Sequence, residues 1–135
     1  MEFDTRIPIY LQIIEKIKKD IILEKIKKGE KLPSVRSMAV ELKVNVNTVQ
    51  RVYQELEREG VTFTQRGKGS FITEDEGIIY EIKNKMANER IRNFVEGMKA
   101  VGYSNEKILE CINEYMKEDE NGTVENWKCD EEIYY

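Results

Sequence analysis

The chain has 135 residues, of which 40% are apolar and 36% are charged, so it can form one average domain or a small domain with an appendage. It lacks a run of about 18 apolar residues, which argues against a membrane span. Its start lacks the residue order of a signal peptide, which predicts a cytoplasmic location. The net charge is −4, but residues 1–73 carry 14 Lys and Arg against 10 Asp and Glu, whereas residues 74–135 carry 8 against 16, so a basic half suited to nucleic acid precedes an acidic half.

The first predicted helix starts after Pro8, which suits a first turn because it has no N–H group to leave unpaired. Isoleucines recur at helical spacing over residues 9–22, and Gly29 is the expected C-terminal stop. The Leu32–Pro33 pair then breaks the helical pattern.

Residues 34–59 have the pattern of two short helices joined by a tight turn. Each segment places apolar residues at i, i+3, i+4 and i+7, on one helical face: Val35, Met38, Ala39 and Leu42 in the first, and Val49, Val52, Tyr53 and Leu56 in the second. Ser34 and Asn45 are the expected N-terminal caps. Because only two residues separate Leu42 from Asn45, the helices must cross sharply, which predicts a helix-turn-helix.

A β-hairpin is predicted directly after this motif. Residues 61–64 and 70–72 are typical of two short strands. Residues 65–69 supply the turn, with glycines for backbone angles that other residues resist. The hairpin makes the motif a winged helix-turn-helix, a form that points to DNA.

Residues 78–101 predict a longer helix with a short heptad seam, and Ser104 is the expected cap of a last helix. Two helices with one apolar face each bury that face poorly on their own. A second copy of the same pair is the simplest partner, which predicts a homodimer. The predicted dimerisation residues are Ile91, Phe94, Met98, Val101, Ile108 and Ile112.

Residues 119–135 are acidic and without periodicity, which predicts a loose tail, although Trp127 and Tyr134–Tyr135 leave open some docking or an added helical turn.

The predicted fold class is mainly α with a small β-hairpin. A winged helix-turn-helix DNA-binding domain covers residues 1–75, a C-terminal two-helix dimerisation appendage covers residues 76–118, and the acidic tail covers residues 119–135.

Inward packing of the second short helix leaves a polar outer face without a carboxylate in its first two turns: Asn47, Thr48, Gln50, Arg51 and Gln54. This composition suits the major groove, where Arg forks onto guanine and Asn or Gln onto adenine. The alternative is an ordinary solvated helix face, and the two-helix context favours DNA. Arg36, with Ser34, either clamps a phosphate or forms an ion pair with Glu41 or another acid.

The hairpin tip carries two cations and two glycines, Arg66, Gly67, Lys68 and Gly69, and suits entry into the minor groove. A nucleotide-phosphate loop is the weaker alternative, because no strand-then-helix context follows it.

No catalytic site, metal or cofactor is predicted. The chain has no histidine, and its acidic residues are spread as helix-surface charge. Cys111 and Cys129 stand alone, without a CxxC pair, so a zinc site is not expected. A disulfide between them is open but disfavoured in a reducing compartment, and Cys111, beside an apolar stripe, is expected to be a structural thiol.

Three segments, PIYLQIIEKIKKDI, GEKLPSVRSMAVELKVNVNTVQRVYQELEREG and QRGKGSFI, resemble the GntR family of bacterial transcription regulators over residues 7–73. The resemblance implies a winged helix whose members bind palindromic operators as dimers. The short helical remainder is similar to the YtrA subfamily, whose appendage serves dimerisation and whose members commonly repress operons for ABC-type transporters. Positions that the resemblance matches to DNA contacts are Ser34, Arg36, Asn45, Asn47, Thr48, Gln50, Arg51, Arg66, Lys68 and Gly69.

Two residues depart from the subfamily pattern. Val46 stands where proline is usual, which predicts a looser start of the recognition helix, although the cap Asn45 is kept. Thr62 stands where an apolar strand residue is usual, so the first strand of the wing is expected to be more exposed.

The sequence therefore predicts a homodimeric, sequence-specific DNA-binding repressor. A protein-docking module is the main alternative, but it does not explain why carboxylates avoid the start of the recognition helix. A small enzyme has no motif to support it. A small-molecule effector is left open, with a pocket expected between the appendage and the winged helix or across the dimer.

Overall fold

The computed structural model describes residues 1–129 and confirms the predicted fold class of helices with one small antiparallel hairpin. The chain forms two compact units, the first covering Met1–Met86 and the second starting at Ala87. In chain order the described elements are α1 (Ile9–Ile22), α2 (Val35–Leu42), α3 (Val46–Arg58), β1 (Thr62–Gln65), β2 (Gly69–Ile72), α4 (Glu76–Ala100), α5 (Asn105–Asn121) and the short 3₁₀ helix η1 (Val124–Asn126).

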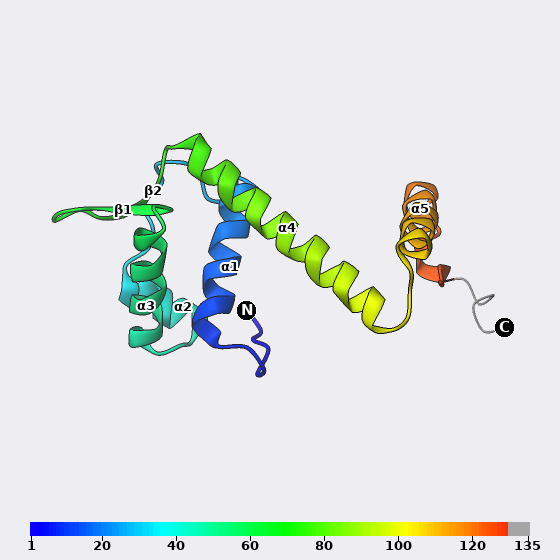
Figure 1. The fold of residues 1–135 in the computed structure, drawn as a ribbon. Helices are drawn as coiled ribbons and strands as arrows, with labels where there is room; N and C mark the ends of the chain where they lie inside the picture. Colours follow the sequence, from blue (N-terminus) through cyan, green and yellow to red (C-terminus); the bar gives the residue numbers. More distant parts are fainter. Residues whose placement is uncertain (130–135) are drawn as a thin grey trace. The chain divides into compact units, whose positions relative to one another are not determined.

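The first unit has its core where three helices meet the base of the hairpin, and the hairpin tip projects away from them (Figure 1). α3 packs against α1, α2 and β1, and its inward residues Val49, Val52 and Leu56 are fully buried. Burying one such side chain contributes about 1.5–3 kcal/mol. α1 supplies a row of buried isoleucines at helical spacing: Ile13, Ile14, Ile17 and Ile21.

The first helix ends earlier than the sequence predicted. α1 stops at Ile22, and Glu24 adopts the left-handed backbone conformation with φ +59°, so Gly29 is not the helix stop. The Gly29 N–H donates instead to the Ile72 carbonyl at 3.0 Å, and the Leu32 N–H donates to the Ser70 carbonyl at 2.8 Å. Residues 29–32 thus lie along β2, which gives hydrogen-bond partners to backbone N–H groups of this non-helical segment.

Both caps predicted for the helix-turn-helix are present. The Ser34 hydroxyl accepts a hydrogen bond from the Ser37 N–H at 3.1 Å, and the Asn45 side-chain oxygen accepts one from the Asn47 N–H at 2.7 Å. Lys43 makes the turn between the helices with φ +57°. The start of α3 is therefore capped in the usual way although Val46 replaces proline.

Tyr53 ties α3 to the segment that precedes α2. Its hydroxyl donates to the Pro33 carbonyl at 2.7 Å. Burial, with the charge of Glu41 as a smaller cause, raises the pKa of Tyr53 to about 12. The phenol therefore keeps its proton, and the hydrogen bond, at any physiological pH.

The hairpin turns at Gly67, which has φ +79°. The turn is closed by a hydrogen bond from the Lys68 N–H to the Gln65 carbonyl. Gly67 thus occupies a backbone region that costs other residues free energy. The expectation of an exposed first strand is wrong at its first residue. Thr62 pairs with Ile72, lies beside the buried Val61 and is itself buried, because the strand starts directly over the core. The strand is exposed only beyond Thr62.

The second unit contains the end of α4, all of α5 and η1. The Ser104 hydroxyl caps α5 as predicted, accepting from the Lys107 N–H at 3.2 Å. The tail predicted to be loose from residue 119 is structured at its start, because α5 continues to Asn121 and the Trp127 ring packs edge-on against Tyr115. Tyr134 and Tyr135 lie outside the described residues. No helix in residues 1–129 combines the length and apolarity that a bilayer crossing needs.

Candidate nucleic-acid interface

The outer face of α3 is polar and accessible, as its sequence pattern predicted. Asn47, Gln50 and Arg51 are exposed, and Thr48 is half-buried at the first turn. The first carboxylate on α3 is Glu55, which is bound by Arg58 in the last turn. The first two turns therefore present amide, hydroxyl and guanidinium groups without a competing acid of their own helix.

Arg51 has a neighbour that sequence reasoning missed. Its guanidinium carbon lies 3.7 Å from the centre of the Tyr10 ring on α1, within the range of a cation–π interaction. Stacking uses the face of the guanidinium and leaves its N–H groups, which lie in the plane, free to donate. Tyr10 carried no signal in the sequence because its partner lies on a different helix, and only the packing of α1 on α3 brings them together.

The start of α2 holds the second group of predicted contact residues. Ser34 is exposed and its side chain is occupied by the cap of α2. Arg36 is exposed, and within residues 1–129 it makes no ion pair with Glu41 or any other acid. The ion-pair alternative for Arg36 is thus not what this structure adopts, and the guanidinium is available to a phosphate.

The wing tip is exposed throughout, and neither Arg66 nor Lys68 forms an ion pair with any residue that the structure describes. Gly69 has φ +116°, and a Cβ atom there would lie 3.0 Å from Cε of Lys31. Lys31, which lies in the segment before α2 and forms a β-bridge with Phe71, is therefore beside the wing. The hairpin itself carries two cations, and Lys31 adds a third close to its backbone.

Two acidic groups near the end of α3 form ion pairs with cations. Glu55 accepts from Arg58, and Glu59 pairs with Lys18 of α1 at 2.9 Å. Hydrogen bonding to Glu55 and its charge raise the pKa of Arg58, so the pair stays charged. The positive character expected for the basic half of the chain is consequently retained where α2, α3 and the wing are exposed.

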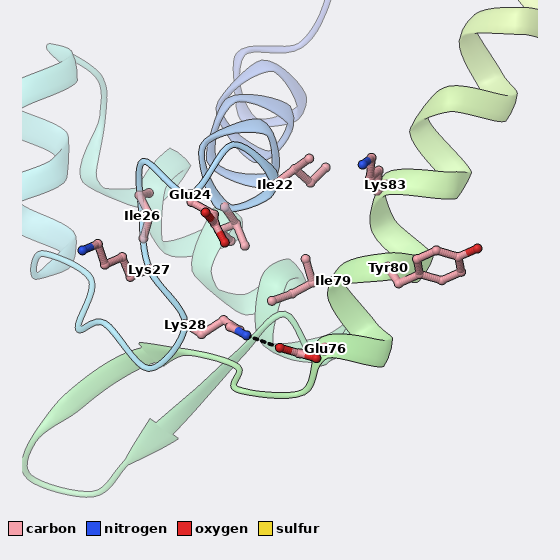
Figure 2. Close-up of a pocket in the computed structure, with 10 residues that line it drawn as sticks. Ile22, Glu24, Ile26, Lys27, Lys28, Glu76, Ile79, Tyr80 and Lys83 are labelled. Atoms are coloured by element: carbon pink, nitrogen blue, oxygen red, sulfur yellow. Dashed lines mark hydrogen bonds and ion pairs between the residues drawn. The ribbon is translucent and has the colours of Figure 1, made fainter.

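A cavity of about 490 Å³ lies between the end of α1, the loop after it and the start of α4, wholly within the first unit (Figure 2). Lys28 from the loop pairs with Glu76 in the first turn of α4, and its hydrogen bond and charge lower the pKa of that carboxyl. The volume is in the range of small-molecule sites. Its walls combine apolar side chains with three lysines, two carboxylates and a phenol: Ile21, Ile22, Ile26, Ile79, Lys27, Lys28, Lys83, Glu24, Glu76 and Tyr80.

The first unit is a winged helix-turn-helix of the class that binds DNA. It has three helices, the second helix of the motif is capped and has a polar outer face, and a cationic hairpin follows.

Residues 9–72 match the model of the bacterial regulatory proteins of the gntR family. The chain is 44% identical to the HTH-type transcriptional regulator YhcF of Bacillus subtilis (strain 168), over 84% of this chain and 94% of YhcF. It is 40% identical to the HTH-type transcriptional repressor YtrA of the same organism, over 79% of this chain and 83% of YtrA.

Among solved structures, a GntR family transcriptional regulator from Listeria monocytogenes superposes with a TM-score of 0.77 at 38% identity, over 83% of this chain and 98% of that one. This protein therefore belongs to the GntR family, with YtrA-like relatives, and is a DNA-binding transcription regulator. The resemblance inferred from the sequence is confirmed.

Proposed function

We propose that this protein is a homodimeric repressor that binds a palindromic operator. The observation that carries the proposal is a set of polar and cationic side chains, none of them a carboxylate, at the start of α2, on the first two turns of α3 and at the wing tip. The α3 residues would read base edges in the major groove, the start of α2 would hold a phosphate, and the wing would reach the minor groove. The proposed contact residues are Ser34, Arg36, Asn45, Asn47, Thr48, Gln50, Arg51, Arg66, Lys68 and Gly69.

The proposed dimer forms through the second unit, where apolar side chains are left uncovered. Ile91 and Phe94 on α4 and Val101 directly after it are 62%, 43% and 70% exposed in the single chain. Such a row on one helix is costly to leave in water and is buried by a second copy related by two-fold symmetry. Of the other residues in the proposed interface, Met98 and Ile112 are half-buried and Ile108 is buried within the unit.

The proposed sign of regulation is supported by the name of a relative, and the proposed target by the subfamily resemblance. YtrA, 40% identical to this chain, is a repressor by its name. We extend that sign to this protein, and we propose control of an ABC-type transporter operon from the subfamily resemblance. A repressor of this kind needs only to occupy its operator. Two recognition helices at the correct spacing would be sufficient for that.

Operator binding is tested by fluorescence anisotropy of the full chain on duplex from upstream of its own gene, with a random duplex alongside at two salt concentrations. We expect a Kd on the order of 10⁻⁸ to 10⁻¹¹ M on the upstream duplex, much weaker binding to the random one, and a steep loss with salt. No binding to either duplex at low salt would instead support the protein-docking alternative.

The stacking of Arg51 on Tyr10 gives a sharper test of the recognition face. Arg51→Ala should weaken operator binding by about 1–3 kcal/mol if the guanidinium forks onto guanine. Tyr10→Leu should weaken it by about two- to fivefold, because the ring no longer aligns the guanidinium, whereas Tyr10→Phe keeps the ring and should stay within about twofold. Both effects are measured by the same anisotropy titration.

The double variant separates alignment from general destabilisation. Once Arg51→Ala is present, Tyr10→Leu should cost nothing further, because the aligned group is gone. An equal loss from Tyr10→Leu in both backgrounds would mean that the ring acts on the fold of α1 and not through Arg51.

For the effector that the sequence left open, we propose the cavity beside α4 as the binding site. Its isoleucine walls and its lysines suit a small ligand with an apolar body and an anionic group. A ligand there would alter operator affinity only if it bound the two spacings of the recognition helices unequally. Repeating the titration with carboxylate and phosphate metabolites tests this, and an affinity set by protein concentration alone would remove the proposal.

A further inference from the structure

The two cysteines, which the DNA-binding site does not use, lie in contact within the second unit. The Cys129 thiol donates to the sulfur of Cys111, with the two Sγ atoms 3.3 Å apart. Both are free thiols, and they are the only cysteines in the 135 residues. Cys111 is buried on α5 and Cys129 is half-buried after η1, so the more accessible thiol is the one nearer the end of the described chain.

The approach of the two thiols is produced by a defined reversal of the chain. α5 ends at Asn121, its C-cap Gly122 has φ +75°, and the Thr123 N–H donates back to the Glu118 carbonyl at 2.9 Å. The segment then returns along α5, where the Trp127 ring packs against Tyr115 with ring centres 5.3 Å apart. Because hydrogen bonds and an aromatic contact fix the reversal of the chain, the fold itself holds the two sulfurs in contact.

We propose that Cys111 and Cys129 form an oxidative modification site that closes to an intrachain disulfide when the protein meets a peroxide or a small-molecule disulfide. The proposal does not depend on DNA binding. A disulfide places its sulfurs about 2.05 Å apart, so closure requires the sulfurs to move together by about 1.3 Å. Disulfides formed in a reducing compartment are usually transient and redox-sensing, which fits a pair that rests as thiols.

With hydrogen peroxide the reaction balances in two steps. The Cys129 thiolate attacks one peroxide oxygen, the O–O bond breaks, and hydroxide leaves as water after taking a proton, which gives a sulfenic acid on Cys129. The Cys111 sulfur then attacks Cys129, an S–S bond forms, the S–O bond breaks, and a second water leaves. Two thiols lose two electrons and two protons in total, and the peroxide gains both.

The surroundings of the two sulfurs set the order of these steps. Burial, together with the hydrogen bond from Cys129, raises the pKa of Cys111 to about 11, with Lys107 opposing and Glu114 adding to the shift. Cys111 is therefore held as the protonated thiol, which is a poor nucleophile. Oxidation starts at the more exposed Cys129, and Cys111 is the resolving thiol.

A closed disulfide would fasten residues 123–129 to α5 beside Ile108 and Ile112. The chain contains a single tryptophan, Trp127, two positions before Cys129, so its fluorescence reports this segment alone. Its indole N–H is buried without a hydrogen-bond partner among the described residues, which makes the emission sensitive to a small shift of the ring.

The test treats the full-length protein with hydrogen peroxide and, separately, with oxidised glutathione. We expect reactive thiols to fall from two to none per chain, a peptide map that joins Cys111 to Cys129, a monomer on a denaturing non-reducing gel, a change in Trp127 emission, and full reversal by dithiothreitol. Two persistent thiols, or disulfides found only between chains, would overturn the proposal.

Single variants provide the matched controls. Cys111→Ala should leave Cys129 trapped as a sulfenic acid that dimedone labels, without the emission change, whereas Cys129→Ala should leave Cys111 largely unreactive. Equal reactivity of the two remaining thiols would contradict the assigned order. The wild-type peptide map decides the main proposal even if the Cys111 variant folds poorly.

Discussion

Phe94→Asp should convert the proposed dimer to a monomer and weaken operator binding by about 10²- to 10⁴-fold. Two linked half-site contacts give a gain of this size over one, because the second contact forms within the same complex. Phe94 is partly exposed in the single chain, so the substitution should leave each chain folded while placing a carboxylate in the apolar seam between copies. Light scattering after size-exclusion chromatography measures the mass, and anisotropy measures the affinity.

Asn93→Asp is the matched control. It adds the same charge to the same helix one residue away, but off the seam that runs through Ile91, Phe94, Met98 and Val101. We expect this variant to remain a dimer with operator affinity within about twofold of wild type. A dimeric Phe94→Asp protein with unchanged affinity would move the interface off α4, and a monomeric Asn93→Asp protein would show that net charge, not the seam, governs assembly.

The helix-turn-helix could be predicted in detail because its determinants are local. Val49, Val52 and Leu56 occupy one face at helical spacing, and any burial of α3 must use that face. The caps at Ser34 and Asn45 are also local, since each side chain bonds a backbone group two or three residues ahead. Local patterns of this kind survive any tertiary arrangement that buries the stripe.

The features that the sequence missed depend on pairs far apart in the chain. The end of α1 is set by residues 29–32 pairing with β2, about 40 residues later, and no helix-stop signal marks Ile22. Thr62 is buried because the core lies beneath the start of β1, whatever its polarity suggests. The Arg51–Tyr10 stack joins two helices, and neither residue predicts the other from its neighbours.

The acidic tail is a second case in which contacts between distant residues could not be predicted from composition. Its composition favours a solvated segment, and charge does dominate the residues around the end of α5. Nevertheless, Trp127 reaches Tyr115, and the reversal at Gly122 brings Cys129 to Cys111. A few apolar and sulfur contacts are enough to fix the structure of a segment whose average composition predicts no fixed structure, because these contacts are made against an existing helix.

Leu56→Ala should lower the free energy of unfolding of the first unit by about 2–5 kcal/mol, the range for truncating a buried leucine. Leu56 is 0% exposed in the last turn of α3, so the cavity left behind is surrounded by side chains that can relax only partly. Urea titration followed by far-ultraviolet circular dichroism measures the loss. Trp127 fluorescence is unsuitable for this purpose because the ring belongs to the second unit.

Leu23→Ala removes the same atoms at a position that is 63% exposed, just past the end of α1, and should change the free energy of unfolding by less than about 0.5 kcal/mol. Both variants are compared at one protein concentration, because the proposed dimer would gain stability with concentration. The total stability of such a domain is about 5–15 kcal/mol, so the Leu56 variant should also lose operator binding on mild warming while Leu23→Ala does not. Equal losses from the two substitutions would mean that α3 is not held by its apolar stripe, and the recognition face would then lack the rigid support that its proposed role requires.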